Sequence, residues 1–160
     1  MSPFMVWEPT PWMRNTAWLM PAFLVGLGII AITALAWPAG AIARRRYGAP
    51  LGMMGVDLTL HRTIHILSWL ALATLGGWML FFGALGKTEA SLDGWIWLLE
   101  IAGAIGFTSL AACAIWIACR SWMHKGTWIA RIWSVLRAAG AVAILWVAVA
   151  FHLISFGANY

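Results

Sequence analysis

The stretch TAWLMPAFLVGLGIIAITALAWPAGAIA occupies residues 16–43 and is followed directly by Arg44, Arg45 and Arg46. It contains no Asp, Glu, Lys or Arg. A helix needs about 20 consecutive apolar residues to cross the hydrocarbon core of a bilayer, so this stretch is long enough to span a membrane. The arginines that follow it are typical of the cytoplasmic side, where Lys and Arg are enriched.

Three further stretches of the chain share this character. No charged residue lies in Thr63–Gly86 or in Ala138–Tyr160, and Glu100 alone interrupts Gly94–Cys119. Only 9% of the 160 residues are charged, whereas a soluble domain usually carries about 25%. The sequence therefore predicts an all-α integral membrane protein, a four-transmembrane-helix bundle. The predicted spans are about residues 16–43, 62–85, 95–119 and 132–156, preceded by an outer interfacial segment at residues 1–15.

Most basic residues lie in or beside two predicted loops, those that follow the first and third spans. They are Arg44, Arg45, Arg46, Arg62, Arg120, Lys125, Arg131 and Arg137. Because Lys and Arg mark the cytoplasmic side, we expect both loops inside and both termini on the outer, periplasmic side of a bacterial inner membrane. This distribution argues against nucleic acid as the partner of the net charge of +5. It favours contact with anionic lipids at the cytoplasmic face.

Individual arginines on this side have expected roles. The run Arg44, Arg45 and Arg46 is first a topology signal, and binding of anionic lipid headgroups is a second role for it. Arg131 belongs to the same basic side. Arg137 lies one and a half helical turns further into the fourth span, and we expect its side chain to snorkel back to the inner surface.

Small residues predict how the spans pack. The pairs with small-xxx-small spacing, which lets helix backbones approach closely, are Ala22 with Gly26 and Ala102 with Gly106. Cys113 and Cys119 both fall on the third span, six positions apart. We expect them to be small buried apolar residues rather than a disulfide.

Glu100 and His152 are ionisable residues inside predicted spans, which makes them functional candidates. By helical rise, Glu100 lies about 7–8 Å below Trp95, and His152 lies about 12 Å below the outer end of its helix. Both are therefore expected in the outer leaflet, on consecutive spans. We expect Glu100 to face the bundle interior with His152 as its partner, either as a structural polar pair or as a proton or lipid-headgroup site.

A second polar group is expected near the inner surface. His61 and His65 are four residues apart on one helical face, a spacing that can hold a metal, and Asp57 and His124 are predicted on the same side. Two well-placed ligands fall short of the three or four that a metal site needs. A haem between His65 and His152 would join opposite leaflets. We therefore predict no cofactor, neither metal nor haem, and a polar cluster at most.

Motifs for catalysis are missing from these residues. No serine is followed three positions later by lysine, and there is no G-x-S-x-G, P-loop or G-x-G-x-x-G. The two halves of the chain share one topology, so the inverted repeat of many transporters is absent as well. We predict that the chain is not itself an enzyme.

The N-terminal segment has no basic n-region leading into a short apolar core, so residues 1–15 do not read as a secretory signal. A first span that enters from outside would be ordinary in the tail of a longer chain whose upstream part is already exported. We therefore expect an exported domain to precede the first span.

Two segments carry a family resemblance. They are Leu35-Ala36-Trp37-Pro38 with Ala43-Arg44-Arg45-Arg46-Tyr47-Gly48, and Arg131-Ile132-Trp133 with Leu145-Trp146, Phe151-His152-Leu153, Phe156 and Asn159-Tyr160. This pattern resembles the membrane-embedded C-terminal region of bacterial serine hydrolases related to class C beta-lactamases. The resemblance implies a periplasmic hydrolase domain upstream. The family's S-x-x-K serine and lysine, tyrosine motif and K-T-G strand are absent, so no catalytic residue is carried over.

These observations leave three hypotheses. The leading one is a non-catalytic membrane module that anchors or regulates an exported serine-hydrolase-like partner domain, or an accessory membrane subunit. The second is a cofactor- or pigment-contacting subunit of a respiratory or photosynthetic complex. The third is a small oligomeric transporter or channel with Glu100 lining the path. A protein partner or a homo-oligomer is expected in each case.

Overall fold

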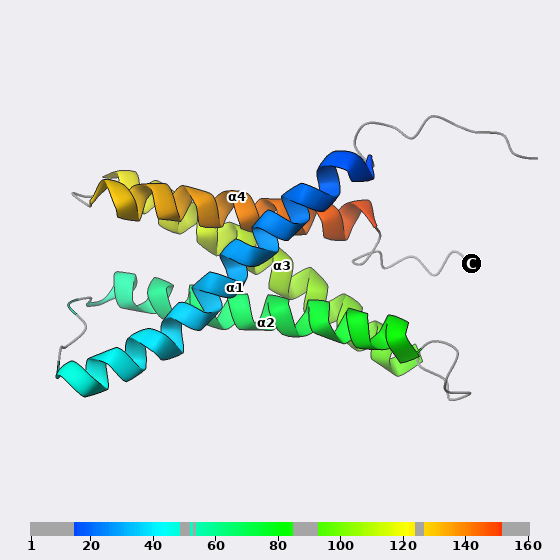
Figure 1. Cartoon of the computed structure of the whole chain (residues 1–160), viewed down its shortest axis with the longest axis horizontal. Coiled ribbons are helices and arrows are strands. Elements are labelled where there is room, and N and C mark those ends of the chain that lie inside the picture. Colours follow the sequence, from blue (N-terminus) through cyan, green and yellow to red (C-terminus); the bar gives the residue numbers. More distant parts are fainter. Residues whose placement is uncertain (1–14, 49–51, 53, 85–92, 124–126, 152–160) are drawn as a thin grey trace, which may run out of the picture.

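The computed structural model describes residues 15–48, 52, 54–84, 93–123 and 127–151, and these residues form four α-helices with no strand among them (Figure 1). The helices are α1 (Thr16–Tyr47), α2 (Val56–Ala84), α3 (Asp93–Met123) and α4 (Trp128–Ala150). Each is long and apolar enough to cross a membrane. The predicted all-α four-helix bundle is thus confirmed.

Helix α1 reaches further than its predicted span. It begins at Thr16, where the side chain of Asn15 accepts a hydrogen bond from the backbone N–H of Ala17 at 3.0 Å, and it continues through Pro38 to Tyr47. Pro38 therefore lies inside the helix and does not end it. A proline removes only one backbone hydrogen bond, and basic side chains stabilise the negative end of the helix dipole. The three arginines of residues 44–46 accordingly form the last turn of α1 rather than a loop.

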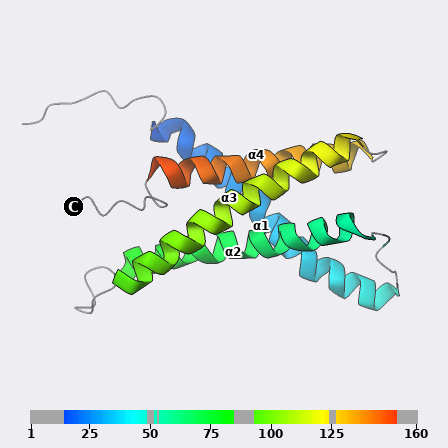
Figure 2. The ribbon, with the colours of Figure 1, turned by 180° about the vertical axis from the view of Figure 1, so that it is seen from behind.

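The helices form a ring in which each contacts two neighbours: α1 packs on α2, α2 on α3, α3 on α4, and α4 on α1. Figure 1 shows α1 crossing the front of the bundle, and Figure 2 shows α3 crossing the opposite side. The start of α1 and the end of α4 lie at one end of the bundle (Figure 1). The other end, which we call the basic end, holds the end of α1, the start of α2, the end of α3 and the start of α4.

Apolar side chains fill the centre of the ring. The core cluster takes side chains from all four helices, and its largest fully buried members are Ile30, Ile64, Phe107, Leu110 and Ile144. Large apolar side chains also cover the outside of every helix, among them Val25, Met79, Ile105 and Val149. An apolar surface that continues around the molecule is stable only in an apolar solvent, so the bilayer is the environment this bundle requires.

Glycines mark the closest helix contacts. A Cβ on Gly26 of α1 would lie 2.9 Å from the carbonyl oxygen of Gly140 on α4, so the two backbones touch at this crossing. A Cβ on Gly106 of α3 would lie 3.3 Å from the side chain of Leu70 on α2. The small-residue spacing therefore located contact positions at Gly26 and Gly106, whereas it did not point to Gly140.

The two cysteines of α3 are both free. Cys113 is half-buried beside the core, but Cys119 is exposed. The expectation that both are buried is therefore wrong for Cys119. On a helix whose surface faces lipid, a small apolar thiol is stable on the outside as well as on the inside.

Candidate functional site

His65 joins α2 to α1 in the half of the bundle nearer the basic end. Its ring is buried, with 4% of the residue surface exposed, and its Nδ1 lies 2.8 Å from the carbonyl oxygen of Thr33. A carbonyl oxygen only accepts hydrogen bonds, so Nδ1 carries the hydrogen and donates it. In neutral His65 the lone pair is then on Nε2. The hydroxyl of Thr33 donates to the carbonyl oxygen of Ile29 at 2.8 Å and does not compete for His65.

Two aromatic rings flank His65. The indole of Trp37, one turn further along α1 than Thr33, is parallel to the imidazole, with centroids 6.1 Å apart and an angle of 9°. The ring of His61, one turn earlier on α2, meets His65 edge-on, with centroids 4.5 Å apart and an angle of 83°. This stack extends the contact between α1 and α2 toward the basic end.

Two arginines from other parts of the bundle approach this pair of histidines. Arg137 on α4 and Arg44 on α1 both interact electrostatically with His61 and His65. We call Arg44, His61, His65 and Arg137 the basic cluster. It draws one side chain each from α1 and α4 and two from α2.

Both arginines of the basic cluster are partly buried. The Nε atom of Arg137 is buried, and no hydrogen-bond partner for it exists among the described residues. The guanidinium of Arg44 folds back along α1, because a Cβ on Gly40 would lie only 3.1 Å from one of its terminal nitrogens. Gly40 is one turn nearer the middle of α1, so the Arg44 side chain leans back along its own helix.

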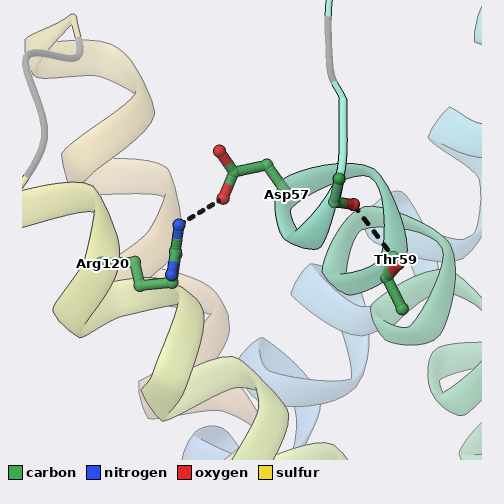
Figure 3. Close-up of polar contacts among 4 residues, drawn as sticks. Asp57, Thr59 and Arg120 are labelled. Carbon is green, nitrogen blue, oxygen red and sulfur yellow. Dashed lines mark hydrogen bonds and ion pairs between the residues drawn. The ribbon is translucent and has the colours of Figure 1, made fainter.

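The carboxylates that the structure describes lie elsewhere. Asp57, in the first turn of α2, forms an ion pair of 3.0 Å with Arg120 on α3 (Figure 3). The same view shows Thr59, whose hydroxyl donates to the carbonyl oxygen of Gly55 at 3.3 Å. Glu100 lies near the start of α3, toward the opposite end of the bundle, and is half-buried. No described carboxylate therefore balances the positive charge of the basic cluster.

A separate polar contact joins α3 to α4. The hydroxyl oxygens of Ser121 and Ser134 are 2.7 Å apart, and Ser134 also donates to the carbonyl oxygen of Arg131 at 2.7 Å. Arg131 donates from Nε to the carbonyl oxygen of Ser121 at 3.3 Å. Its guanidinium carbon lies 5.6 Å from the ring centres of both Trp122 and Trp128. Arg131 of α4 is therefore held in place by side-chain and backbone groups of α3 and α4.

The other predicted site residues have mixed outcomes. His61 and His65 are neighbours as expected, but His124 lies outside the described residues. Within the part of the chain that the structure describes, no group of three or more His, Cys, Asp or Glu side chains converges as a metal site would require. His152 also lies outside the described residues, so its pairing with Glu100 stays a prediction. Arg45 and Arg46 are exposed on the last turn of α1.

The sequence reasoning missed Thr33, Ser121 and Ser134. Thr33 and Ser134 are hydroxyl residues within predicted spans, and Ser121 follows the third predicted span; all three lie in the basic half of the bundle. Such residues hydrogen-bond between membrane helices, and this was the available signal. No family model, curated protein or solved structure matches the chain, so what the site can do follows from its geometry alone. Two guanidinium groups and an imidazole that no described carboxylate balances are suited to binding an anion.

Proposed function

We propose that this chain is a non-catalytic membrane module that anchors or regulates an exported partner domain in a bacterial inner membrane. The observation that carries the proposal is the packing at the centre of the bundle. Phe107 and Leu110 of α3 are fully buried there, against Ile30 of α1 and Ile144 of α4. The described interior therefore serves to hold helices together, which is what an anchor requires and what a polar transport path through one bundle would not provide.

The distribution of arginines supports an orientation for this module. All four helices place arginine at the basic end: Arg44, Arg45 and Arg46 on α1, Arg62 on α2, Arg120 on α3, and Arg131 on α4. By the positive-inside rule the basic end faces the cytoplasm. The start of α1 and the end of α4 then face the periplasm, where an exported domain preceding α1 would be correctly placed.

The nature of the partner rests on the sequence resemblance. A chain that resembles the membrane region of serine hydrolases related to class C beta-lactamases is suited to hold a hydrolase domain of that kind, either in the same polypeptide or as a separate subunit.

Reporter fusions test the orientation. Alkaline phosphatase, which is active only outside the cytoplasm, is fused after Tyr160, and a green fluorescent protein, which fluoresces only inside it, is fused after Gly48. We expect both reporters to be active. Exchanging the two reporters is the control and should silence both. If the exchanged set is the active one, the orientation is reversed and the anchor proposal fails with it.

Chemical cross-linking tests the partner. Cells that express the tagged chain are cross-linked and then treated with a fluorescent penicillin, which acylates the catalytic serine of penicillin-binding-protein-like hydrolases. We expect a labelled band covalently attached to the tagged chain, and we expect excess unlabelled penicillin to remove the label. A cross-linked partner that never takes the label contradicts a hydrolase. A haem or chlorophyll absorption band in the purified protein contradicts the anchor and favours a cofactor-contacting subunit.

A further inference from the structure

We propose that the basic cluster is a binding site for a phosphate group, in which Arg44, His61 and Arg137 hold the phosphate oxygens. The group is carried either by the headgroup of an anionic lipid or by a small phosphate compound. This proposal goes beyond the anchoring function and does not depend on the identity of the partner domain.

The positive charge of Arg137 is not balanced by a described acid. This residue lies nine positions after Trp128, the first residue of α4, which is about 13 Å along the helix. A guanidinium at this depth is costly unless it is paired or solvated. Its Nε is covered and has no partner among the described residues, so the side chain does not present all its donors to water. Asp57, in the first turn of α2, is engaged with Arg120.

The side chains of the basic cluster come from three helices and lie at a similar depth along the bundle. Side chains on a helix lean toward its N-terminus. Because α1 runs toward the basic end and α4 runs away from it, Arg44 leans into the membrane while Arg137 leans back toward the surface. The position of the Arg44 guanidinium over Gly40 shows this lean directly. The two guanidinium groups thus approach each other's depth from opposite sides, beside His61 of α2.

The hydrogen-bond donors of the basic cluster match the oxygens of a phosphate group. A guanidinium offers a planar fork of N–H donors that matches two oxygens of a phosphate, and it stays charged at any physiological pH. Two such forks and one imidazole N–H supply more donors than a single carboxylate can accept, whereas a phosphate has oxygens for all of them. A phosphate is therefore the anion that this donor set favours.

His65 acts in this site as a positioning residue. Its Nδ1–H is committed to the carbonyl oxygen of Thr33, so in the neutral ring no N–H remains for the phosphate. Its edge-on contact with His61 holds that ring in place. The same hydrogen bond fixes α1 against α2 three turns before Arg44, which sets where the Arg44 guanidinium lies.

Lipid titration of the purified full chain tests the proposal. The protein in mild detergent is titrated with phosphatidylglycerol, with a diacylglycerol that lacks phosphate, and with sodium phosphate at constant ionic strength. Native mass spectrometry reports the bound species. We expect phosphatidylglycerol to bind with a defined stoichiometry and the phosphate-free lipid not to do so. Competition by inorganic phosphate assigns the site to a small phosphate compound, and no competition assigns it to a lipid. Equal binding of both lipids overturns the proposal.

A matched pair of variants distinguishes a specific binding site from nonspecific electrostatic attraction of anionic lipid. Arg44→Gln and Arg45→Gln remove the same charge from adjacent positions, but only Arg44 belongs to the basic cluster, while Arg45 is exposed. We expect the apparent dissociation constant for phosphatidylglycerol to rise about fivefold more in Arg44→Gln than in Arg45→Gln. Equal losses overturn the proposal. Arg137→Lys, which keeps the charge but loses the fork, should weaken binding as well.

Gly40→Ala tests the geometry without changing any charge. The added Cβ would lie 3.1 Å from a terminal nitrogen of Arg44 and must displace that flexible group. We expect weaker phosphatidylglycerol binding without a loss of thermal stability. Gly28→Ala on the same helix is the control, because its Cβ would meet nothing within 4 Å. Binding in Gly40→Ala that equals binding in Gly28→Ala contradicts a role for the Arg44 position.

Discussion

The contact between Gly26 and Gly140 offers the sharpest test of the fold, through two alanine substitutions on one helix. Gly26 and Gly28 lie two positions apart in α1. Gly26 is buried against the backbone of α4, whereas a Cβ on Gly28 would meet nothing within 4 Å. Each substitution adds one methyl group and removes one glycine from a helix, so the pair differs only in what the methyl group meets.

The magnitude follows from the distances at the crossing. Replacing glycine by alanine within a helix stabilises it by about 1 kcal/mol, and this gain is common to both variants. In Gly26→Ala the Cβ would lie 2.9 Å from the carbonyl oxygen and 3.4 Å from the Cα of Gly140. These are backbone atoms and cannot rotate away, so α1 and α4 must separate. Overpacking of this kind costs about 1–3 kcal/mol, and we expect Gly26→Ala to be less stable than Gly28→Ala by that amount.

Equilibrium unfolding in mixed micelles, with increasing sodium dodecyl sulfate and circular dichroism as the readout, measures this difference. Gly28→Ala should be at least as stable as the natural protein. Gly140→Ala places a Cβ 3.3 Å from the Cα and the carbonyl oxygen of Gly26, so it should be destabilised in the same direction but by less. If Gly26→Ala unfolds together with Gly28→Ala, the two backbones do not touch at this crossing and the packing of α1 on α4 is wrong.

Three further sets of substitutions test the polar contacts by the same unfolding assay. A double-mutant cycle of Ser121→Ala and Ser134→Ala should give a coupling energy of about 0.5–1.5 kcal/mol, and additive effects would show that the two hydroxyls do not interact. His65→Phe keeps a ring but loses the hydrogen bond to α1, so it should lower the free energy of unfolding by about 0.5–1.5 kcal/mol. His61→Phe should lower it by less. An equal loss in the two variants would contradict the role of His65. Asp57→Asn weakens a partly exposed ion pair and should cost less than about 1 kcal/mol, and a larger loss would show that this contact is shielded from water.

The number and order of the helices were predictable because the bilayer fixes how long an uncharged run must be. The ends were less predictable, since the reasoning assigned charged residues to loops. Helix formation does not stop at a charge: the arginines from Arg44 to Arg46 extend α1 by a turn, and Asp57 lies in the first turn of α2. Both placements suit the helix dipole, because cations stabilise the C-terminal end of a helix and anions the N-terminal end.

The basic cluster was not predictable from the sequence because it depends on how each helix is rotated about its axis. In a soluble bundle the polar face of a helix reveals that rotation. Here the faces toward lipid and toward the core are both apolar, as the exposed Val25 and the buried Ile30 of α1 illustrate. From the sequence we expected Arg137 to snorkel to the inner surface, and we grouped His61 with His65 without the arginines.

Apolar and polar contacts join the helices at different positions along the length of this bundle. Near the middle, α1 and α4 are in backbone contact at Gly26 and Gly140, and the core around them is apolar, so these helices have little freedom to shift there. Toward the basic end the described helices are joined instead by polar contacts, such as the bond from His65 to the carbonyl of Thr33. Individual contacts of this kind are worth about 1 kcal/mol and can be exchanged for others. A ligand that pairs with the guanidinium of Arg137 would act at the end of the bundle where these polar contacts lie. Phosphate binding would therefore set the relative positions of α1, α2 and α4 at the basic end while leaving the centre unchanged.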